Sequence, residues 1–434
     1  MLIEKLKSIN IDNIPSKNPS LTTYFSLSTN EKSSEKAFDS NDLCGLLVGL
    51  QQNKQLKENF TQEDFIAKSL KKFQNKIDNQ EHIDVIQNMY FLNNMLPKLS
   101  PVMYLSNPKV DTKTKKSFLI FAQMLQASEQ NEIKPQQLNF IEQEIFDLFN
   151  EYILDRKHDF KSHSYLPFLD DVFTQDFNKL LKNQHYFRNQ IDRFLKFYMF
   201  TYSSQLALNI HDAPLEEPSP KKLYFILNHE KASSERKNLL NYGYKILASK
   251  AKKLFPYLSL LENISKVIDE KDLKYFHFKE ISENETNLKI LDNIRDLYRQ
   301  AKSMDESVLR SSTLEEALQF LLNSTNEQFR TDKKAVLDRF LTAFEMQIAQ
   351  PFFQTRGRAG KVLVMDQDTI LLLTNLSIGT KSQLRFQELM KMFEIRGVFF
   401  DAKSQDALLE LFERIGNIDR KSDSGDAVYV KSTI

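Results

Sequence analysis

Glycine is distributed very unevenly along this chain, and this distribution constrains the fold more than any other feature. Six of the nine glycines fall in the last 78 of the 434 residues, and only Gly243 lies between positions 50 and 356. Tight turns and left-handed backbone positions depend on glycine. A span so poor in glycine, and rich in Leu, Lys, Phe, Asn and Gln, predicts long helices joined by few tight turns.

The size of the chain indicates more than one domain. At 434 residues it exceeds an ordinary single domain, and its 34 Phe and 15 Tyr supply enough apolar area for packed cores. The formal net charge is only +1, so a nucleic-acid or membrane partner would have to be recognised through local charge.

Two breaks in the helical pattern divide the chain into four regions. Three prolines lie within residues 214–220, where a helix cannot continue, and a second break lies near Pro351. Residues 1–35 are polar and predict a partly ordered N-terminal arm. We therefore expect a mainly α protein: a helical multi-domain body, with a helical domain at 36–210 and another at 221–350, and a C-terminal module at 351–434.

Three short helices and a hairpin are expected in the C-terminal module. Helical segments at 368–377, 384–395 and 405–415 each end before a glycine, namely Gly379, Gly397 and Gly416. The expected N-caps are Asp366, Ser382 and Ser404. Two short β-type runs, 417–421 and 427–431, flank a polar turn at 422–426 and predict a hairpin. This pattern is typical of a winged helix, a helix-turn-helix variant.

The charge of this winged-helix-like module leaves its partner open between DNA and protein. The third helix occupies the recognition position, and it would expose Asp406, Glu410 and Glu413 against Arg414. The wing tip carries two further acids, Asp423 and Asp426. Carboxylates facing phosphates are unfavourable, so protein is as good a partner as DNA.

Residues 221–253 carry the strongest functional signal. They contain nine positively charged side chains and only two acids, Glu230 and Glu235, with four aromatic residues interleaved and Phe255 and Tyr257 just beyond. Such a stripe is typical of phosphate-tracking surfaces. The alternative is a solvated helix face balanced by the acidic segment that follows at 262–285. The entry loop of the C-terminal module, 355–361, adds three charges. The predicted DNA-binding residues are Lys221, Lys222, Arg236, Lys237, Lys245, Lys250, Lys252, Lys253, Arg356, Arg358 and Lys361.

No catalytic motif is evident, so no catalytic residue, metal ligand or cofactor is assigned. Gly360-Lys361 is followed by Val362, so it is not a P-loop, and Cys44 is the only cysteine. The histidines form no zinc pattern. Glu235-Arg236-Lys237 has the spelling of a nuclease Asp/Glu-x-Lys motif, but it should open a helix and not lie on a strand. We expect a non-enzyme without a small-molecule substrate.

The chain also has no sequence signal for a membrane. Its N-terminus lacks the apolar core of a signal peptide, and no stretch approaches the ~18 apolar residues of a membrane span. The expected compartment is the cytoplasm.

Several segments resemble the DptG family. They are residues 357–368, 393–397 and 422–430 in the tail, together with 223–227 and 230–237. The resemblance implies a subunit that works with DptF-like and DptH-like partners in the restriction arm of bacterial DNA phosphorothioation systems. ATPase activity would come from those partners, in keeping with the missing P-loop. The family supplies no catalytic residues to carry over.

Together these observations predict a non-enzymatic subunit that binds double-stranded DNA or acts as an adaptor in an anti-phage restriction complex. One rival is a protein-interaction scaffold without DNA affinity of its own. A second is a nuclease subunit that uses Glu235 or Lys237.

Overall fold

The computed structural model is mainly helical, as expected, and contains only short strands. It describes residues 2–15, 21, 23–27, 29, 36–106, 110–125, 133, 137–156, 163–212, 214–232, 236–331, 333–420 and 428–434. The chain forms two compact units. The larger unit contains Met1–Ala37, Ser162–Leu169 and Phe197–Thr433; the smaller contains Phe38–Lys161, Asp170–Lys196 and Ile434. These units divide the chain differently from the four regions expected from sequence.

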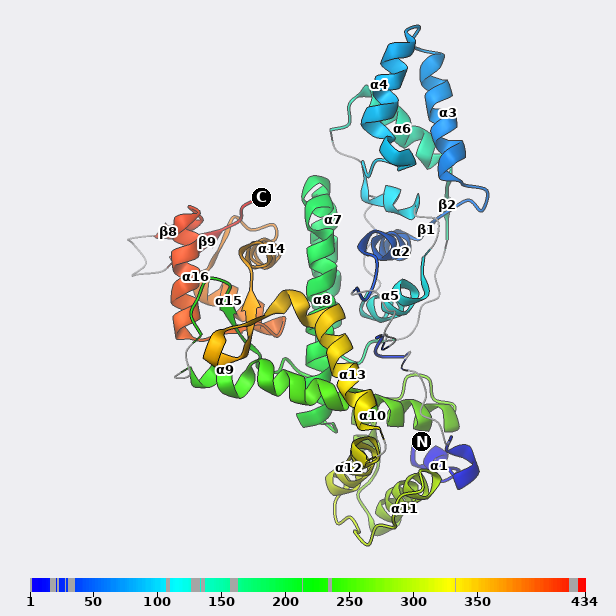
Figure 1. Ribbon diagram of the computed structural model, residues 1–434, viewed down its shortest axis with the longest axis vertical. Helices are drawn as coiled ribbons and strands as arrows, with labels where there is room; N and C mark the ends of the chain where they lie inside the picture. Colours follow the sequence, from blue (N-terminus) through cyan, green and yellow to red (C-terminus); the bar gives the residue numbers. More distant parts are fainter. Residues whose placement is uncertain are drawn as a thin grey trace. The chain divides into compact units, whose positions relative to one another are not determined.

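The smaller unit contains two groups of helices: one includes the helices at 40–52 and 112–124, and the other the helices at 62–74, 80–90 and 140–150 (Figure 1). Its elements are α2 Ser40–Gln52, β1 Lys54–Leu56, α3 Gln62–Gln74, α4 Gln80–Tyr90, η2 Leu92–Asn94, η3 Pro101–Ser106, α5 Thr112–Met124, α6 Phe140–Asn150, β2 Ile153–Asp155 and most of α7 Pro167–Lys182. Asp39 caps α2 by accepting from the amides of Asn41 and Asp42. A Cβ at Gly45 would stand 2.3 Å from the Tyr104 carbonyl oxygen, so glycine permits α2 to approach η3. Cys44 is fully buried beside it.

The helix α8, Gln184–Asp212, supplies residues to both units, and its second half enters the larger one. The remaining helices there are α1 Leu2–Leu6, η1 Ile11–Asn13, α9 Lys237–Tyr242, α10 Tyr244–Val267, η4 Tyr275–Glu280, α11 Glu285–Ala301, α12 Leu314–Thr331, α13 Lys334–Phe344, η5 Glu345–Ala349 and η6 Gln350–Phe352. The described part of the N-terminal arm is packed into this unit: Tyr24 and Phe25 are buried, and the Tyr202 hydroxyl donates to the Tyr24 carbonyl over 2.9 Å.

A four-stranded sheet in the larger unit was not anticipated from the sequence. Its strands are β3 Tyr224–Leu227, β4 Phe353–Thr355, β5 Lys361–Met365 and β7 Phe399–Phe400, in the order β4-β5-β3-β7. β3 is parallel to both β5 and β7, whereas β4 forms an antiparallel hairpin with β5. The carboxyl ends of β3, β5 and β7 therefore meet at one edge, where ligands bind in parallel sheets.

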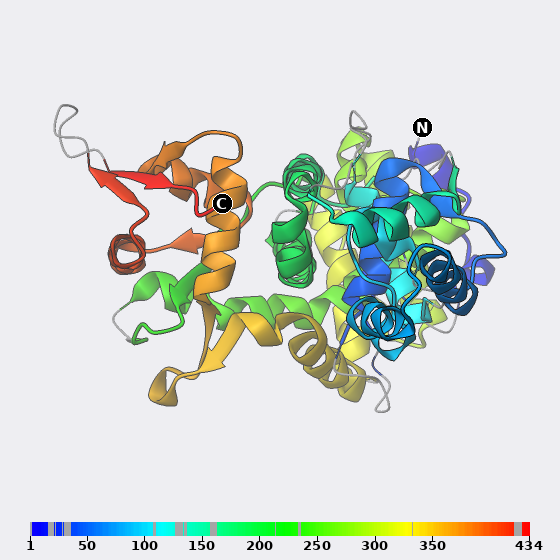
Figure 2. The ribbon, with the colours of Figure 1, turned by 90° about the horizontal axis from the view of Figure 1, so that it is seen from above.

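The C-terminal region alternates helices with short strands (Figure 2). It comprises α14 Gln367–Ile378, β6 Gln383–Arg385, α15 Phe386–Ile395, α16 Ala402–Arg414, β8 Ile418–Arg420 and β9 Val428–Lys431, and the last three strands form a sheet in the order β6-β9-β8. β8 and β9 are antiparallel, as the hairpin prediction requires. The expected turn at 422–426, with Asp423 and Asp426, lies outside the described residues.

The helix boundaries confirm part of the expected cap chemistry and correct the rest. Asp366 caps α14, and Gly379, Gly397 and Gly416 all have positive φ just past their helices. The predicted N-caps Ser382 and Ser404 are wrong: residue 382 precedes β6, and Asp401 caps α16 by accepting from the Ser404 amide. At α16 the helix begins three residues earlier than Ser404 predicts, and the Asp401 side chain accepts from a free amide of its first turn.

Candidate nucleic-acid interface

Arg236 was predicted to contact DNA, but it is buried within the protein. Its guanidinium bonds Glu230 over 2.8 Å, Asp401 over 2.8 Å through Nε, and the Ser404 hydroxyl over 2.6 Å. Only 6% of the residue is exposed. Glu230 follows β3 and Asp401 follows β7, so Arg236 ties together the carboxyl ends of two neighbouring parallel strands. The residue holds the fold and is not available to a phosphate.

The electrostatics of this cluster fit a fixed ion network. Burial alone would raise the pKa of Asp401, but the Arg236 guanidinium and the Ser404 amide outweigh it and lower that pKa. Burial disfavours the charged guanidinium, yet its hydrogen bonds to Asp401 and Glu230 raise the pKa of Arg236. Arg236 and Asp401 therefore remain charged near neutral pH.

Three lysines of α10 also have partners inside the protein. Lys250, which is buried, pairs with Asp212 at the end of α8. Lys252 pairs with Asp338 of α13, and the Lys253 ammonium lies 3.1 Å from Nε2 of His211. These pairings reduce the positive charge that the three lysines could offer to phosphates.

The loop predicted at 355–361 is the turn of the β4–β5 hairpin, and two of its cations brace the hairpin base. Arg356 donates to the Asn228 carbonyl. Lys361 pairs with Glu345 over 2.7 Å and lies 5.3 Å from the centre of the Tyr244 ring and 5.1 Å from that of Phe353. Arg358, at the tip of the turn, is exposed.

Five of the eleven predicted DNA-binding side chains make no ion pair or side-chain hydrogen bond in the described structure. They are Lys221, Lys222, Lys237, Lys245 and Arg358, and all are exposed except Lys221, which is half-buried. Lys237 begins α9 and Lys245 lies in the first turn of α10. Because Lys361 at the hairpin base contacts Tyr244, the hairpin lies beside the start of α10. These five side chains are the candidate interface.

The structure describes two of the three residues of the nuclease-like motif. Glu235 lies outside the described residues, Arg236 is held in the buried network, and Lys237 opens a helix, as the sequence indicated, and does not lie on a strand. Among the residues that the structure describes, no three His, Cys, Asp or Glu side chains gather in a group that could hold a metal ion.

A pocket of about 210 Å³ lies at the carboxyl edge of β3 and β5. Asn228, His229 and Gln367 line it together with apolar side chains from β5, α14 and α16. The sequence drew no attention to these positions, because the strands that bring them together are too short to be recognised by periodicity.

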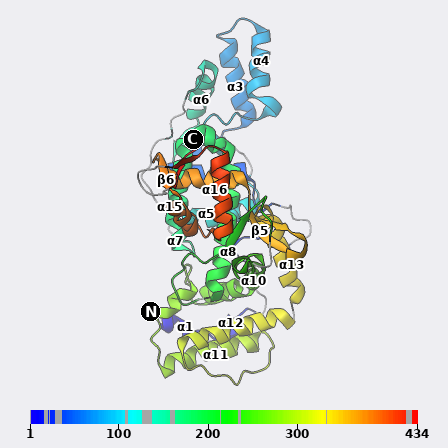
Figure 3. The same cartoon turned by 90° about the vertical axis from the view of Figure 1, so that its left-hand side faces the viewer.

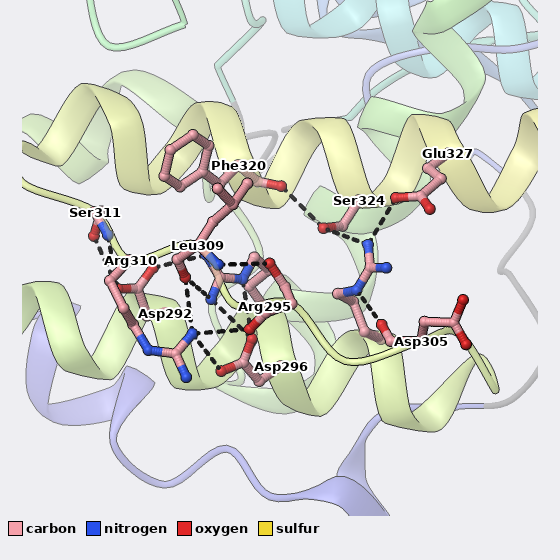
Figure 4. A network of polar contacts seen from close by, with 12 residues as sticks. Asp292, Arg295, Asp296, Asp305, Leu309, Arg310, Ser311, Phe320, Ser324 and Glu327 are labelled. Atoms are coloured by element: carbon pink, nitrogen blue, oxygen red, sulfur yellow. Dashed lines mark hydrogen bonds and ion pairs between the residues drawn. The ribbon is translucent and has the colours of Figure 1, made fainter.

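A buried arginine network between α11 and α12 was also missed (Figures 3 and 4). Arg295 bonds Asp292 over 3.0 Å, Asp296 over 2.9 Å and the Leu309 carbonyl over 2.8 Å. Arg299 bonds the Asp305 carbonyl over 2.6 Å and Glu327 over 2.7 Å. The network ties the connecting loop 303–313 to α11 through the Asp305 and Leu309 carbonyls. The sequence did contain a sign that these arginines are buried, because helical spacing places both on the same face as Leu288, Leu291 and Tyr298.

The outer face of α16 is acidic, as expected. Asp406, Glu410 and Glu413 are exposed, and Ser404, Leu408 and Leu411 face inward. The N-terminus of the helix is occupied by the Asp401–Arg236 network. Of the helices in the described part of the chain, none combines the length and apolar character needed to cross a bilayer.

Comparison with known proteins gives no relative: no family model and no curated protein matches the chain.

Proposed function

We propose that this chain is a non-enzymatic DNA-binding or adaptor subunit of a bacterial phosphorothioation-dependent restriction complex. The observation that carries the DNA-binding part is a set of exposed cations, Lys237, Lys245 and Arg358. Its members come from segments far apart in sequence, and none of them is neutralised by a carboxylate in the described structure. The restriction context, its cytoplasmic setting and the DptF-like and DptH-like partners are inferred from the resemblance to the DptG family.

The proposed DNA surface is smaller than the sequence indicated. Six of the predicted residues pair with other groups of the chain, so the phosphate contacts are assigned to Lys221, Lys222, Lys237, Lys245 and Arg358. These side chains would neutralise backbone phosphates without reading base sequence, which is the usual basis of non-specific binding.

We also assign a winged-helix fold to residues 366–434, and we propose that it binds protein. The assignment is supported by the sheet order β6-β9-β8 and by the order α14, β6, α15, α16, β8 and β9, into which β7 is inserted before α16 as a strand of the other sheet. The helix in the recognition position, α16, has an acidic outer face and a blocked N-terminus. Both features oppose phosphate binding and favour a partner surface rich in Lys and Arg.

The test is fluorescence anisotropy with a labelled duplex of about 30 base pairs, between 50 and 300 mM salt. The triple variant Lys237→Glu, Lys245→Glu and Arg358→Glu should lower affinity at least tenfold. Its matched control reverses three exposed lysines of the smaller unit, Lys57, Lys71 and Lys115, and should change affinity less than twofold. Circular dichroism establishes that both variants are folded.

An equal loss in both variants would show that net charge alone decides binding and would reject this interface. No binding by the wild type at 50 mM salt would reject the DNA-binding function altogether. Retained binding in the triple variant would place the contact elsewhere.

A protein-interaction scaffold is the second candidate, and the loop 303–313 favours it. Val308 is 92% exposed and Leu309 is 53% exposed, although the main chain beneath them is held by Arg295 and Arg299. A fixed loop that presents apolar side chains is typical of docking sites. This reading predicts stable co-purification with the restriction subunits, lost on changing Val308 and Leu309 to Asp, with no DNA affinity.

A further inference from the structure

We infer that the β4–β5 hairpin is a probe of the DNA minor groove, with Arg358 as the inserted side chain. This inference rests on the proposed DNA-binding function and adds to it the groove, the inserting residue and the base composition that the site prefers.

The hairpin is rigid at its base. Arg356 and Gln354 both donate to Asn228, which follows β3, so the hairpin is attached to the central strand of the sheet. On its other strand, Lys361 is held by Glu345 and by the rings of Tyr244 and Phe353. The turn itself closes with three main-chain hydrogen bonds: Arg356 amide to Gly360 carbonyl, 2.8 Å; Ala359 amide to Arg356 carbonyl, 2.9 Å; and Gly360 amide to Gly357 carbonyl, 3.2 Å. Little ordering is therefore required when the tip binds.

The tip is free and slender. Gly357 and Gly360 have φ of +47° and +70°, and a Cβ at either position would have no neighbour within 4 Å. Between them stand only Arg358 and Ala359. Figure 2 shows this turn, at the end of the gold hairpin, standing away from the neighbouring helices. The one long side chain at the apex is the arginine.

The composition of the tip favours the minor groove. The major groove, about 12 Å wide, admits a helix or a two-stranded ribbon, whereas the minor groove is only about 6 Å wide. A turn of Gly, Arg, Ala and Gly adds no bulky side chain beside the arginine, so it suits the narrower groove. Guanidinium is more weakly hydrated than ammonium and is attracted by the strong negative potential of a narrow A·T groove.

The surrounding charges fit this docking. Lys245 follows Tyr244, whose ring lies against Lys361 at the hairpin base. With the tip in the groove, Lys245 would lie toward the bordering phosphates. Salt-dependent affinity would come from Lys245 and Lys237, and groove preference from Arg358.

The experiment measures the affinity of the full chain for three duplexes of equal length: A·T-rich, G·C-rich, and one with inosine·cytosine pairs. Inosine lacks the guanine 2-amino group, so its minor groove resembles that of A·T, whereas its major groove resembles that of G·C. The wild type should bind the A·T and inosine duplexes several-fold more tightly than the G·C duplex. Arg358→Ala should abolish this preference, Arg358→Lys should reduce it at equal charge, and Lys237→Ala should weaken binding to all three equally.

Two results would overturn the inference while leaving the proposed function standing. One is equal wild-type affinity for all three duplexes. The other is a uniform loss in Arg358→Ala that Arg358→Lys restores completely, because a phosphate contact needs only the charge. Failure of the wild type to bind any duplex would remove the proposed function as well.

Discussion

Arg236 is a residue whose role depends on partners that only the folded chain brings together. It stands between Glu230 and Asp401, which are far from each other in sequence and have side chains only 10% and 11% exposed. Arg236→Met should lower the free energy of unfolding by about 3–5 kcal/mol, because two buried carboxylates lose their common counter-charge. Urea denaturation measures this, with Lys237→Met as the exposed neighbouring control, expected within about 0.5 kcal/mol of wild type. Adding Glu230→Gln and Asp401→Asn to Arg236→Met should recover part of the loss; no recovery would contradict the ion-network interpretation.

Lys98 gives the smaller unit a stability that depends on pH. Burial lowers the pKa of its ammonium to about 8, although the group donates to the Met103 carbonyl over 3.2 Å and the Ser106 hydroxyl over 3.0 Å. The folded state therefore binds fewer protons than the unfolded state between about pH 8 and pH 10.5, so the contribution of Lys98 to stability rises with pH across that window.

Lys98→Met should accordingly be more stable than wild type at pH 7, by up to about 3 kcal/mol, and should lose most of this advantage by pH 10. The measurement is urea denaturation at both pH values, with the exposed Lys115→Met as control. An advantage that stays constant with pH would show that the charge of Lys98 is not responsible.

At the residue scale, the sequence predicted the role of a side chain correctly where that role depends on neighbouring residues in the chain. Asp366 caps its helix and Cys44 is buried, as a helix start and an apolar run indicated. The sequence did not predict the role of a charged side chain whose ion-pair partner is far away in the chain. Arg236, Lys250 and Lys252 read as solvent-facing cations because Asp401, Asp212 and Asp338 cannot be assigned to them without the fold.

Among the elements, the α11–α12 connection is held by side chains and not by regular secondary structure. Arg299→Leu removes the bonds to the Asp305 carbonyl and to Glu327. We expect trypsin to cleave after Arg310, 61% exposed as a side chain, roughly tenfold faster in this variant, because cleavage requires local opening. Mass spectrometry identifies the cut, and Lys289→Leu on the exposed face of α11 serves as the control. Unchanged cleavage would mean that Arg295 alone fixes the loop.

Helices and the C-terminal hairpin strands could be predicted from sequence, but the strands of the four-stranded sheet could not, because they are too short. Phe386, Leu389, Met390 and Phe393 follow helical spacing, and they are buried on α15 as that spacing requires. β3 has four residues and β7 only two, too few to show an alternating pattern. The central sheet, with the pocket at its edge, was therefore outside the reach of periodicity.

For the whole molecule, a formal charge of +1 means that DNA affinity depends on a local surface. Five available cations predict a slope of about −4 for the logarithm of the binding constant against the logarithm of salt concentration. The eleven cations expected from sequence would give a slope about twice as steep. Anisotropy titrations across 50–300 mM salt separate the two, and a slope near −9 would show that the internal ion pairs open on binding.

The two units do not follow the boundary that the prolines at 214–220 suggested. Residues 214–220 do end α8, but the segments before and after them pack into the same larger unit. Gln205 shows how: its amide bonds the main chain of Lys221, and its side chain fills the space where a Cβ of Gly397 would stand. A proline-rich segment marks the end of a helix and need not mark the end of a domain.

Labelling of Cys44 can report when the smaller unit opens. It is the only thiol in the chain, it is fully buried, and burial raises its pKa well above the ordinary value. A thiol reagent can therefore modify the native protein only through molecules whose smaller unit has opened. The labelling rate of the unmodified chain then measures that opening separately from the larger unit, so a bound duplex or partner that slows labelling must stabilise the unit containing Cys44.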